Sequence, residues 1–318
     1  MAVPMSNLRI AYSSRATEEI LKGTVALNLV NRNWESEVQS GLGTLIPQFE
    51  IGTTADITDY TRGSNWKTLQ DVTVSQQQFN LDKHSEWGHK VNYLDETETT
   101  LSLVDNQARS DSYIAGQYVD EYIWDSIVAG VSSANTLEAY VANDLTSESA
   151  ITNNTVQNSV FNTVKELINS LVEANLMGPS AMGGVPPVIV MHTTPFLAFL
   201  EALERRDLNI GELNAQMFVS AAIGGAMPWG GRYRNVNIIS HANFSTITRD
   251  VSGTATTFFP IVALTTDFCT YASRPVTAQL LTPGTNQTSP DYAIRGILDH
   301  KAQVVDPNRA YMKQIKTA

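Results

Sequence analysis

The stretch GLGTLIPQFEIGTTADITDYTRG, residues 41–63, is long, polar and rich in residues that favour strands. A second extended run, LQDVTVSQQQFNLDKHSEWGHKV, covers residues 69–91, and the turn-forming residues between the two runs predict a hairpin. Both faces of this hairpin are polar, and a two-stranded ribbon alone in water is marginally stable at best. The sequence therefore predicts a ribbon that something else supports, and a neighbouring subunit is the natural candidate.

Composition places the chain among globular proteins. It has 318 residues, of which 42% are apolar and 17% charged. The charged fraction is low for a monomer, which indicates that uncharged surface is buried against other chains. The net charge of -11 argues against tight binding to a phosphate backbone, although solubility is a simpler explanation for it. The first residues lack a signal-peptide pattern, and no apolar run is long enough for a membrane span.

The rest of the chain alternates helical and extended patterns, which predicts an α+β fold. The pattern over 98–131 predicts a helix far longer than the average of about 11–12 residues. Residues 155–176, capped by Thr155, and 193–207, with Thr194 as cap, predict two more helices. A weaker pattern predicts a helix over 17–34 that Gly23 disfavours. A buried strand is expected at 188–191 and another strand at 236–240, and 258–315 reads as mostly extended.

A search for catalytic motifs yields none with the required spacing. There is no phosphate-binding glycine loop, dinucleotide fingerprint or nucleophile elbow. His84, Glu86 and His89 are close in sequence, but in a strand His89 points away from the other two, so polar strand residues explain them better than a zinc site. Cys269 lies in an apolar run and is expected to be a packed thiol. The sequence predicts no enzyme, no cofactor and no metal.

The order of the predicted elements resembles that of the major capsid proteins of tailed phages, which have the Hong Kong 97-like fold. NLVNRNWESEVQSGLGTLIPQF, residues 28–49, resembles the family's lead-in to an extended loop. FNTVKELINSLVEANLMGPSAMGGVPPVIVMHTTPFLAFLE, residues 161–201, resembles the helix, loop, strand and helix of its axial domain. GGRYRNVNIISHANF, residues 230–244, is similar to a further element of the family. The resemblance extends over nearly the whole chain.

The resemblance implies a division of the chain by region. It implies an N-terminal arm, an extended loop over an adjacent subunit, a peripheral domain built on a long spine helix, and an axial domain around the five- and six-fold axes. The corresponding residues are 1–36 for the arm, 37–82 for the loop, 83–149 for the peripheral domain, 150–255 for the axial domain, 256–300 for strands that return to the peripheral domain, and 301–318 for a final axial strand. The contact candidates in the loop are Gly43, Pro47, Gly52, Tyr60, Arg62, Trp66 and Lys67.

The function that the resemblance implies is that of a shell subunit. Copies would assemble as pentamers and hexamers into an icosahedral capsid around double-stranded DNA, without sequence-specific DNA binding and without a membrane. The expected partners are a separate scaffolding protein and a portal, whereas binding of a decoration protein stays open. The expected location is the virion, with assembly in the host cytoplasm. Two alternatives remain: a nanocompartment shell similar to encapsulin, and a soluble α+β enzyme.

Overall fold

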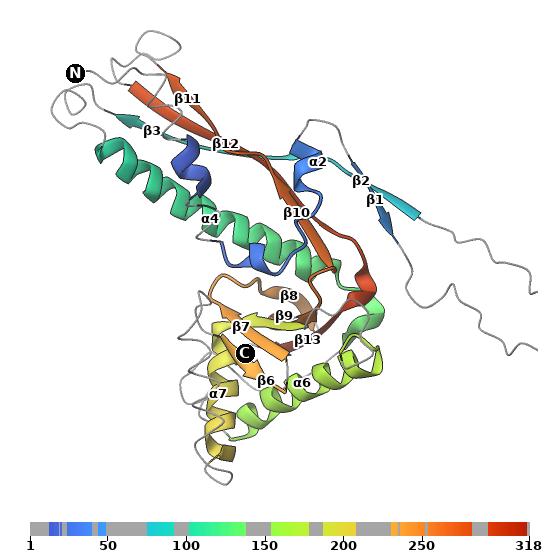
Figure 1. Cartoon of the computed structure of the whole chain (residues 1–318). Coiled ribbons are helices and arrows are strands. Elements are labelled where there is room, and N and C mark those ends of the chain that lie inside the picture. Colours follow the sequence, from blue (N-terminus) through green and yellow to red (C-terminus); the bar gives the residue numbers. More distant parts are fainter. Residues whose placement is uncertain are drawn as a thin grey trace, which may run out of the picture.

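The computed structural model describes twelve segments of the chain, and its elements fall into two parts (Figure 1). The four-stranded part is a sheet of four strands with the long helix α4 along it. The seven-stranded part is a second sheet with the helices α6 and α7. The described residues are 13–18, 20, 24–39, 44–48, 75–91, 102–137, 154–177, 187–207, 230–234, 236–251, 254–281 and 292–316.

In the four-stranded part, strand β12 is central and every pairing is antiparallel. β3 pairs along one edge of β12, while β10 and β11 follow one another along the other edge. Within the region 258–315 that was expected to be mostly extended, β12 is one continuous strand of 13 residues. The elements are β3 (Lys83–Val91), α4 (Ser102–Gly130), β10 (Cys269–Ser273), β11 (Thr277–Leu281) and β12 (Tyr292–Val304).

In the seven-stranded part, the strand order is β4-β13-β9-β5-β7-β6, and β8 pairs with β9. β5 and β7 are parallel to each other, and β4 is parallel to β13. The elements are β4 (Thr136–Leu137), α6 (Asn154–Glu173), β5 (Val188–His192), α7 (Thr193–Asp207), β6 (Gly230–Tyr233), β7 (Val236–His241), β8 (Ile247–Val251), β9 (Thr254–Leu264) and β13 (Ala310–Lys316). The boundary expected at residue 256 therefore falls inside β9, which pairs with β5 and β13 in this sheet.

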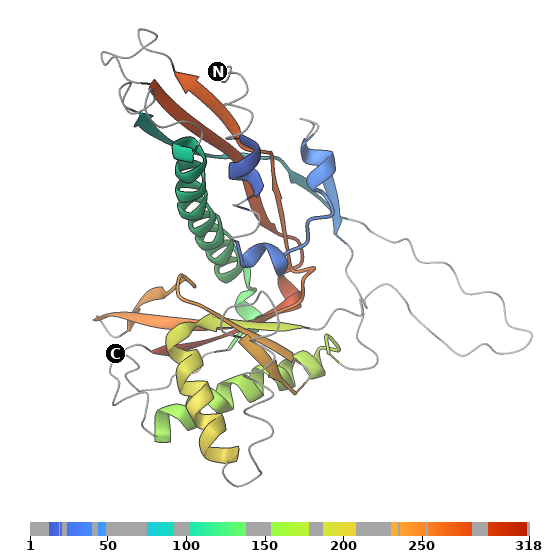
Figure 2. The same ribbon diagram turned by 60° about the vertical axis from the view of Figure 1, so that its left-hand side comes forward.

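Both faces of the seven-stranded sheet are covered. Ile189 and Met191 of β5 belong to a core shared with α6 and α7, whereas Val188 and Val190 belong to a core shared with α4. Figure 2 shows the consequence: α6 and α7 lie on one side of the sheet, and the four-stranded part stands on the other. Burial on both faces explains why β5 reads as a continuous apolar run rather than an alternating one.

The predicted long helices are confirmed. α4 has 29 residues, and α6 and α7 have 20 and 15. The cap predicted at Thr194 is wrong, because α7 already includes Thr193 and the amide of Thr194 donates to Nδ1 of His192 at 3.1 Å. α6 includes Asn154, so Thr155 also lies within the helix rather than before it. None of the described helices has both the length and the apolar character needed to cross a bilayer.

The helix predicted over 17–34 is confirmed only at its start, and the rest of it is wrong. Residues 13–18 and 20 are helical, but the described residues that follow form the 3-10 turn η1 (Ala26–Asn28) and the short helix α2 (Glu35–Gln39). Tertiary contacts replace the helical hydrogen bonds, because the amides of Val25 and Ala26 donate to the side chain of Asp120 in α4. This segment consequently packs between the two parts, and its residues 24–30 belong mainly to the core that α4 shares with both sheets.

Candidate assembly interface

The predicted ribbon is present at its base. β1 (Thr44–Gln48) pairs antiparallel with β2 (Ser75–Phe79), from Thr44 opposite Phe79 to Gln48 opposite Ser75. No third strand joins this pair within the described residues, and the pair lies beside the four-stranded part (Figure 1). Gln76 and Gln78 of β2 are exposed. The exposed residues of β2 at the base of the ribbon are thus polar, and among the described strands β1 and β2 pair with each other alone.

An apolar cluster attaches the ribbon to the four-stranded part. Phe79, the last residue of β2, is fully buried against Val38 of α2 and Ala272 of β10. Trp34 and Leu81 pack at the edge of this cluster. Because one buried phenylalanine joins the ribbon, α2 and the sheet, the root of the ribbon is held in a defined position.

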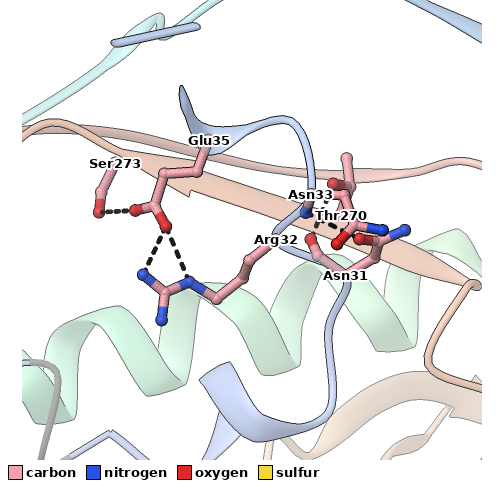
Figure 3. A network of polar contacts seen from close by, with 6 residues as sticks. All are labelled: Asn31, Arg32, Asn33, Glu35, Thr270 and Ser273. Atoms are coloured by element: carbon pink, nitrogen blue, oxygen red, sulfur yellow. Dashed lines mark hydrogen bonds and ion pairs between the residues drawn. The ribbon is translucent and has the colours of Figure 1, made fainter. Parts of the chain in front are cut away.

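A polar network reinforces this attachment (Figure 3). The guanidinium of Arg32 donates two hydrogen bonds to one carboxylate oxygen of Glu35, at 3.0 and 2.5 Å, and the hydroxyl of Ser273 donates to the other at 3.1 Å. Nearby, the carbonyl of Asn31 accepts from the hydroxyl of Thr270 at 2.8 Å. Glu35 of α2 is therefore connected to β10 by one charge-assisted hydrogen bond, from Ser273, which is stronger than a neutral one.

The outer face of the four-stranded sheet carries cross-strand ion pairs. Asp82 binds Lys301 at 2.8 Å, and His84 lies 2.7 Å from Asp299. Glu86 pairs with Arg295 on the same face. The HSEWGH stretch is thus a strand whose even-numbered side chains face solvent, and the described residues contain no group of three His, Cys, Asp or Glu side chains arranged to hold a metal.

The exposed side of α4 is unusually apolar. Tyr113, Ile114 and Tyr118 are 64%, 62% and 44% exposed. A cavity of about 400 Å³ lies between this side of α4 and β3, with Trp87 and Leu298 among its apolar lining. An exposed apolar patch of this kind is typical of a contact surface. The apolar spacing in the sequence did not single out this patch, although the apolar residues around more than one side of the helix were a signal.

The predicted contact residues in the ribbon are only partly described. Pro47 lies in β1 opposite Gln76. The other predicted residues, Gly43, Gly52, Tyr60, Arg62, Trp66 and Lys67, lie outside the described residues.

Two sets of groups, the thiol of Cys269 and the pair Ser85 and His300, could be considered for catalysis. Cys269 is fully buried, and desolvation raises the pKa of its thiol to about 12, so it is a packed thiol as predicted. Ser85 Oγ lies 2.9 Å from Nε2 of His300, the separation of a nucleophile and its base. The second nitrogen of that ring, Nδ1, has no hydrogen-bond partner within the described part, so no carboxylate orients it as in a catalytic triad.

Asp120 joins α4 to two other elements. Its carboxylate accepts from the amides of Val25 and Ala26 at 3.1 and 2.8 Å, and it lies 3.6 Å from Nε2 of His241 in β7. Nδ1 of His241 accepts from the amide of Asn243, which leaves Nε2 as the ring's donor toward Asp120. Desolvation is the main reason why the pKa of Asp120 rises to about 6. The carboxylate thus links the N-terminal segment, α4 and the seven-stranded sheet.

Comparison with solved structures identifies the fold. A structure from Mycobacterium phage Che8 superposes with a TM-score of 0.61 at 16% identity, covering 91% of this chain and 90% of that one. The mature capsid of bacteriophage PhiM1 superposes with a TM-score of 0.54 at 11% identity, over 86% of this chain and 82% of that one. The chain has the fold of phage capsid proteins.

The same capsid fold occurs in a solved encapsulin complex. The holo-SrpI encapsulin complex from Synechococcus elongatus has a TM-score of 0.54 at 9% identity, over 87% of this chain and 83% of that one. Neither a protein-family model nor a curated protein matches the sequence. The capsid fold is therefore established by the arrangement of elements over most of the chain.

Proposed function

We propose that this chain is the major capsid protein of a tailed phage, and that its copies assemble as pentamers and hexamers into an icosahedral shell around double-stranded DNA. The observation that carries this proposal is the match of the fold to phage capsid structures over 86–91% of the chain. The low charged fraction of 17% is consistent with extensive contact between copies. No described group of residues supports a catalytic role, so the function we infer is structural.

In this proposal the subunit has the Hong Kong 97-like division into domains. The four-stranded part, with α4 as its spine, corresponds to the peripheral domain. The seven-stranded part corresponds to the axial domain, and the pairing of β9 with β5 and β13 supports moving the return to the peripheral domain from residue 256 to a point after Leu264. Residues 37–82 form the extended loop, of which β1 and β2 are the base.

The contacts between copies would use two surfaces. The extended loop, with the candidates Gly43, Pro47 and Gly52, would lie over an adjacent subunit, because polar strands with unpaired edges are templates for pairing with another chain. The apolar side of α4, with Tyr113 and Ile114, would form a second contact with another copy. The remaining partners are a separate scaffolding protein and a portal, in a capsid that forms in the host cytoplasm.

A nanocompartment shell is the second candidate function. The observation that favours it is the likeness to the encapsulin complex, whose TM-score of 0.54 equals that of the PhiM1 capsid. The two candidates differ in what the shell encloses: packaged DNA in one case and an enzyme in the other.

Electron microscopy of the purified full chain in negative stain tests both candidates. The proposal predicts closed icosahedral particles, alone or after co-expression with a scaffolding protein from the same genome. A protein that stays monomeric under both conditions and turns over a substrate would contradict it. Particles isolated from the native source distinguish the candidates further, because nuclease-protected double-stranded DNA indicates a phage capsid and a protein cargo indicates a nanocompartment.

A further inference from the structure

A fully buried histidine lies where α4 packs on the four-stranded sheet. His300 of β12 has no exposed surface, and three tyrosine rings surround it. The ring of Tyr122 in α4 meets it edge-on with 5.0 Å between centroids, and those of Tyr118 and Tyr271 lie at 6.5 and 6.0 Å. The imidazole is therefore part of the contact between the helix and the sheet rather than of the solvent-facing surface.

The hydrogen bonding of His300 suits only the neutral ring. Nε2 lies 2.9 Å from the hydroxyl of Ser85 in β3, and a hydroxyl either donates or accepts. Nδ1 is buried without a partner in the described part of the chain. Protonation would place a second N–H donor at Nδ1, where no acceptor meets it, and a buried donor without a partner destabilises the folded state.

The charges around His300 also disfavour its protonation. The ammonium group of Lys83 in β3 lies 5.8 and 5.7 Å from the ring centres of Tyr118 and Tyr122, on the helix side of the sheet. Burial is the main cause that lowers the pKa of His300 to about 4, and Lys83 and His84 lower it further. Asp299, the neighbouring residue on β12, raises the pKa but does not offset the other effects.

We propose that His300 is an acid-sensitive contact that seats α4 on the four-stranded sheet: α4 packs closely while the imidazole is neutral, and protonation of the imidazole loosens this packing. The device lies within one subunit and does not depend on the function proposed above. The direction of this pH effect follows from proton linkage. A histidine whose pKa is lower in the packed state than in the open state favours opening as the pH falls.

Hydrogen exchange of the unassembled full chain measures this opening. Exchange of α4 amides between residues 115 and 124, corrected for the intrinsic effect of pH, gives the equilibrium constant for local opening. With a pKa of about 4 in the packed state and about 6.5 in the open state, the opening constant rises roughly tenfold at pH 5.5 and roughly 70-fold at pH 4.5, relative to pH 7.5.

The decisive comparison is between His300→Gln and His84→Gln. Glutamine keeps a polar group near Ser85 but does not titrate, so His300→Gln is expected to abolish the acid-induced rise in α4 exchange. His84→Gln removes an exposed histidine next to the same site in the sheet. Because His84 has the smallest of these effects on the pKa of His300, this variant should keep most of the acid-induced rise. An equal pH response in His300→Gln and the wild type, or no response in the wild type, overturns the proposal.

A second variant keeps the test decisive if His300→Gln does not fold. Lys83→Met removes the nearby cation, so the pKa of His300 rises toward its ordinary value and the acid-induced change in opening becomes smaller. An unchanged pH response in Lys83→Met would contradict the electrostatic part of the argument. Because the readout is taken on unassembled subunits, its outcome is separate from whether the chain forms shells.

Discussion

The amide of Ala26 donates a 2.8 Å hydrogen bond to the carboxylate of Asp120, which lies 94 residues further along the chain. This contact fixes a short turn of the N-terminal segment against the middle of α4. The same carboxylate lies 3.6 Å from His241 in the seven-stranded sheet. One side chain therefore connects three elements at the junction between the two parts of the subunit.

Asp120→Asn is expected to change how stability depends on pH. The pKa of Asp120 is about 6 in the folded chain, against 3.8 as its ordinary value, so the folded state binds this proton more tightly than the unfolded state does. The resulting stabilisation is fully present below the unfolded pKa and is lost as the pH rises through about 6. Between pH 4.5 and pH 7 the free energy of unfolding of the wild type should therefore fall by about 2 kcal/mol relative to that of Asp120→Asn.

Urea unfolding of the unassembled chain at these two pH values measures the difference. Asp125→Asn is the matched control, since Asp125 is an exposed acid on the same helix. The titration of His300 is common to all three proteins and cancels in the comparison. Parallel pH profiles for the wild type and Asp120→Asn would show that the burial of Asp120 does not perturb its titration.

Phe79→Ala is expected to detach the ribbon from the sheet. Removing a fully buried phenylalanine side chain typically lowers the free energy of unfolding by about 3–5 kcal/mol, and here the cavity would open where β2, α2 and β10 meet. Gln78→Ala alters the adjacent exposed residue and should cost less than about 0.5 kcal/mol. Chemical unfolding measures the loss in free energy of unfolding for both variants. The rate of proteolysis between residues 49 and 74 shows whether the root of the ribbon has detached. Similar losses for the two variants would refute the role of Phe79.

Gly296→Ala is expected to destabilise the four-stranded sheet. A Cβ at this position would come within 2.6–2.8 Å of the indole ring of Trp87 on β3, closer than van der Waals contact allows. Overpacking of this kind costs typically about 1–3 kcal/mol. Gly116→Ala, in α4, meets only ordinary contacts and gains helix propensity, so it should be neutral or slightly stabilising.

A double-mutant cycle isolates the cause of the Gly296 effect. In a Trp87→Leu background the ring is absent, and the cost of Gly296→Ala should fall by more than half. Thermal unfolding of the four proteins supplies the comparison. The same cost in both backgrounds would mean that Trp87 does not explain the requirement for glycine.

Replacing Gly43 and Gly52 together with Val is expected to impair assembly more than folding. The proposed reason is that glycine lets the ribbon bend as copies come together, whereas a β-branched residue restricts the backbone. Sedimentation velocity measures the fraction of chain in particles, and circular dichroism of the unassembled chain measures folding. Particles of normal yield and shape from the double variant would refute this role of the two glycines.

Periodicity in the sequence located most elements of the fold but not their partners. The apolar spacing predicted α4 and α6, and the continuous apolar run predicted β5. The helix expected over 17–34 does not continue past its start, because the amides of Val25 and Ala26 bond to Asp120 and Asn31 forms a bridge with Thr270. The apolar side of α4 was missed because a helix with apolar residues all round does not reveal which of them remain exposed after packing.

The sequence by itself determined the kind of local structure in most segments, because helix and strand periods depend on neighbouring residues. It also predicted the paired strands at the base of the ribbon. Only the tertiary structure decided that Asp120 is buried where α4 meets the N-terminal segment, and that His300 is buried where α4 meets the four-stranded sheet. It also decided that β9 belongs to the seven-stranded sheet. These outcomes depend on contacts between residues far apart in the chain, and local spacing contains no information about which distant surfaces meet.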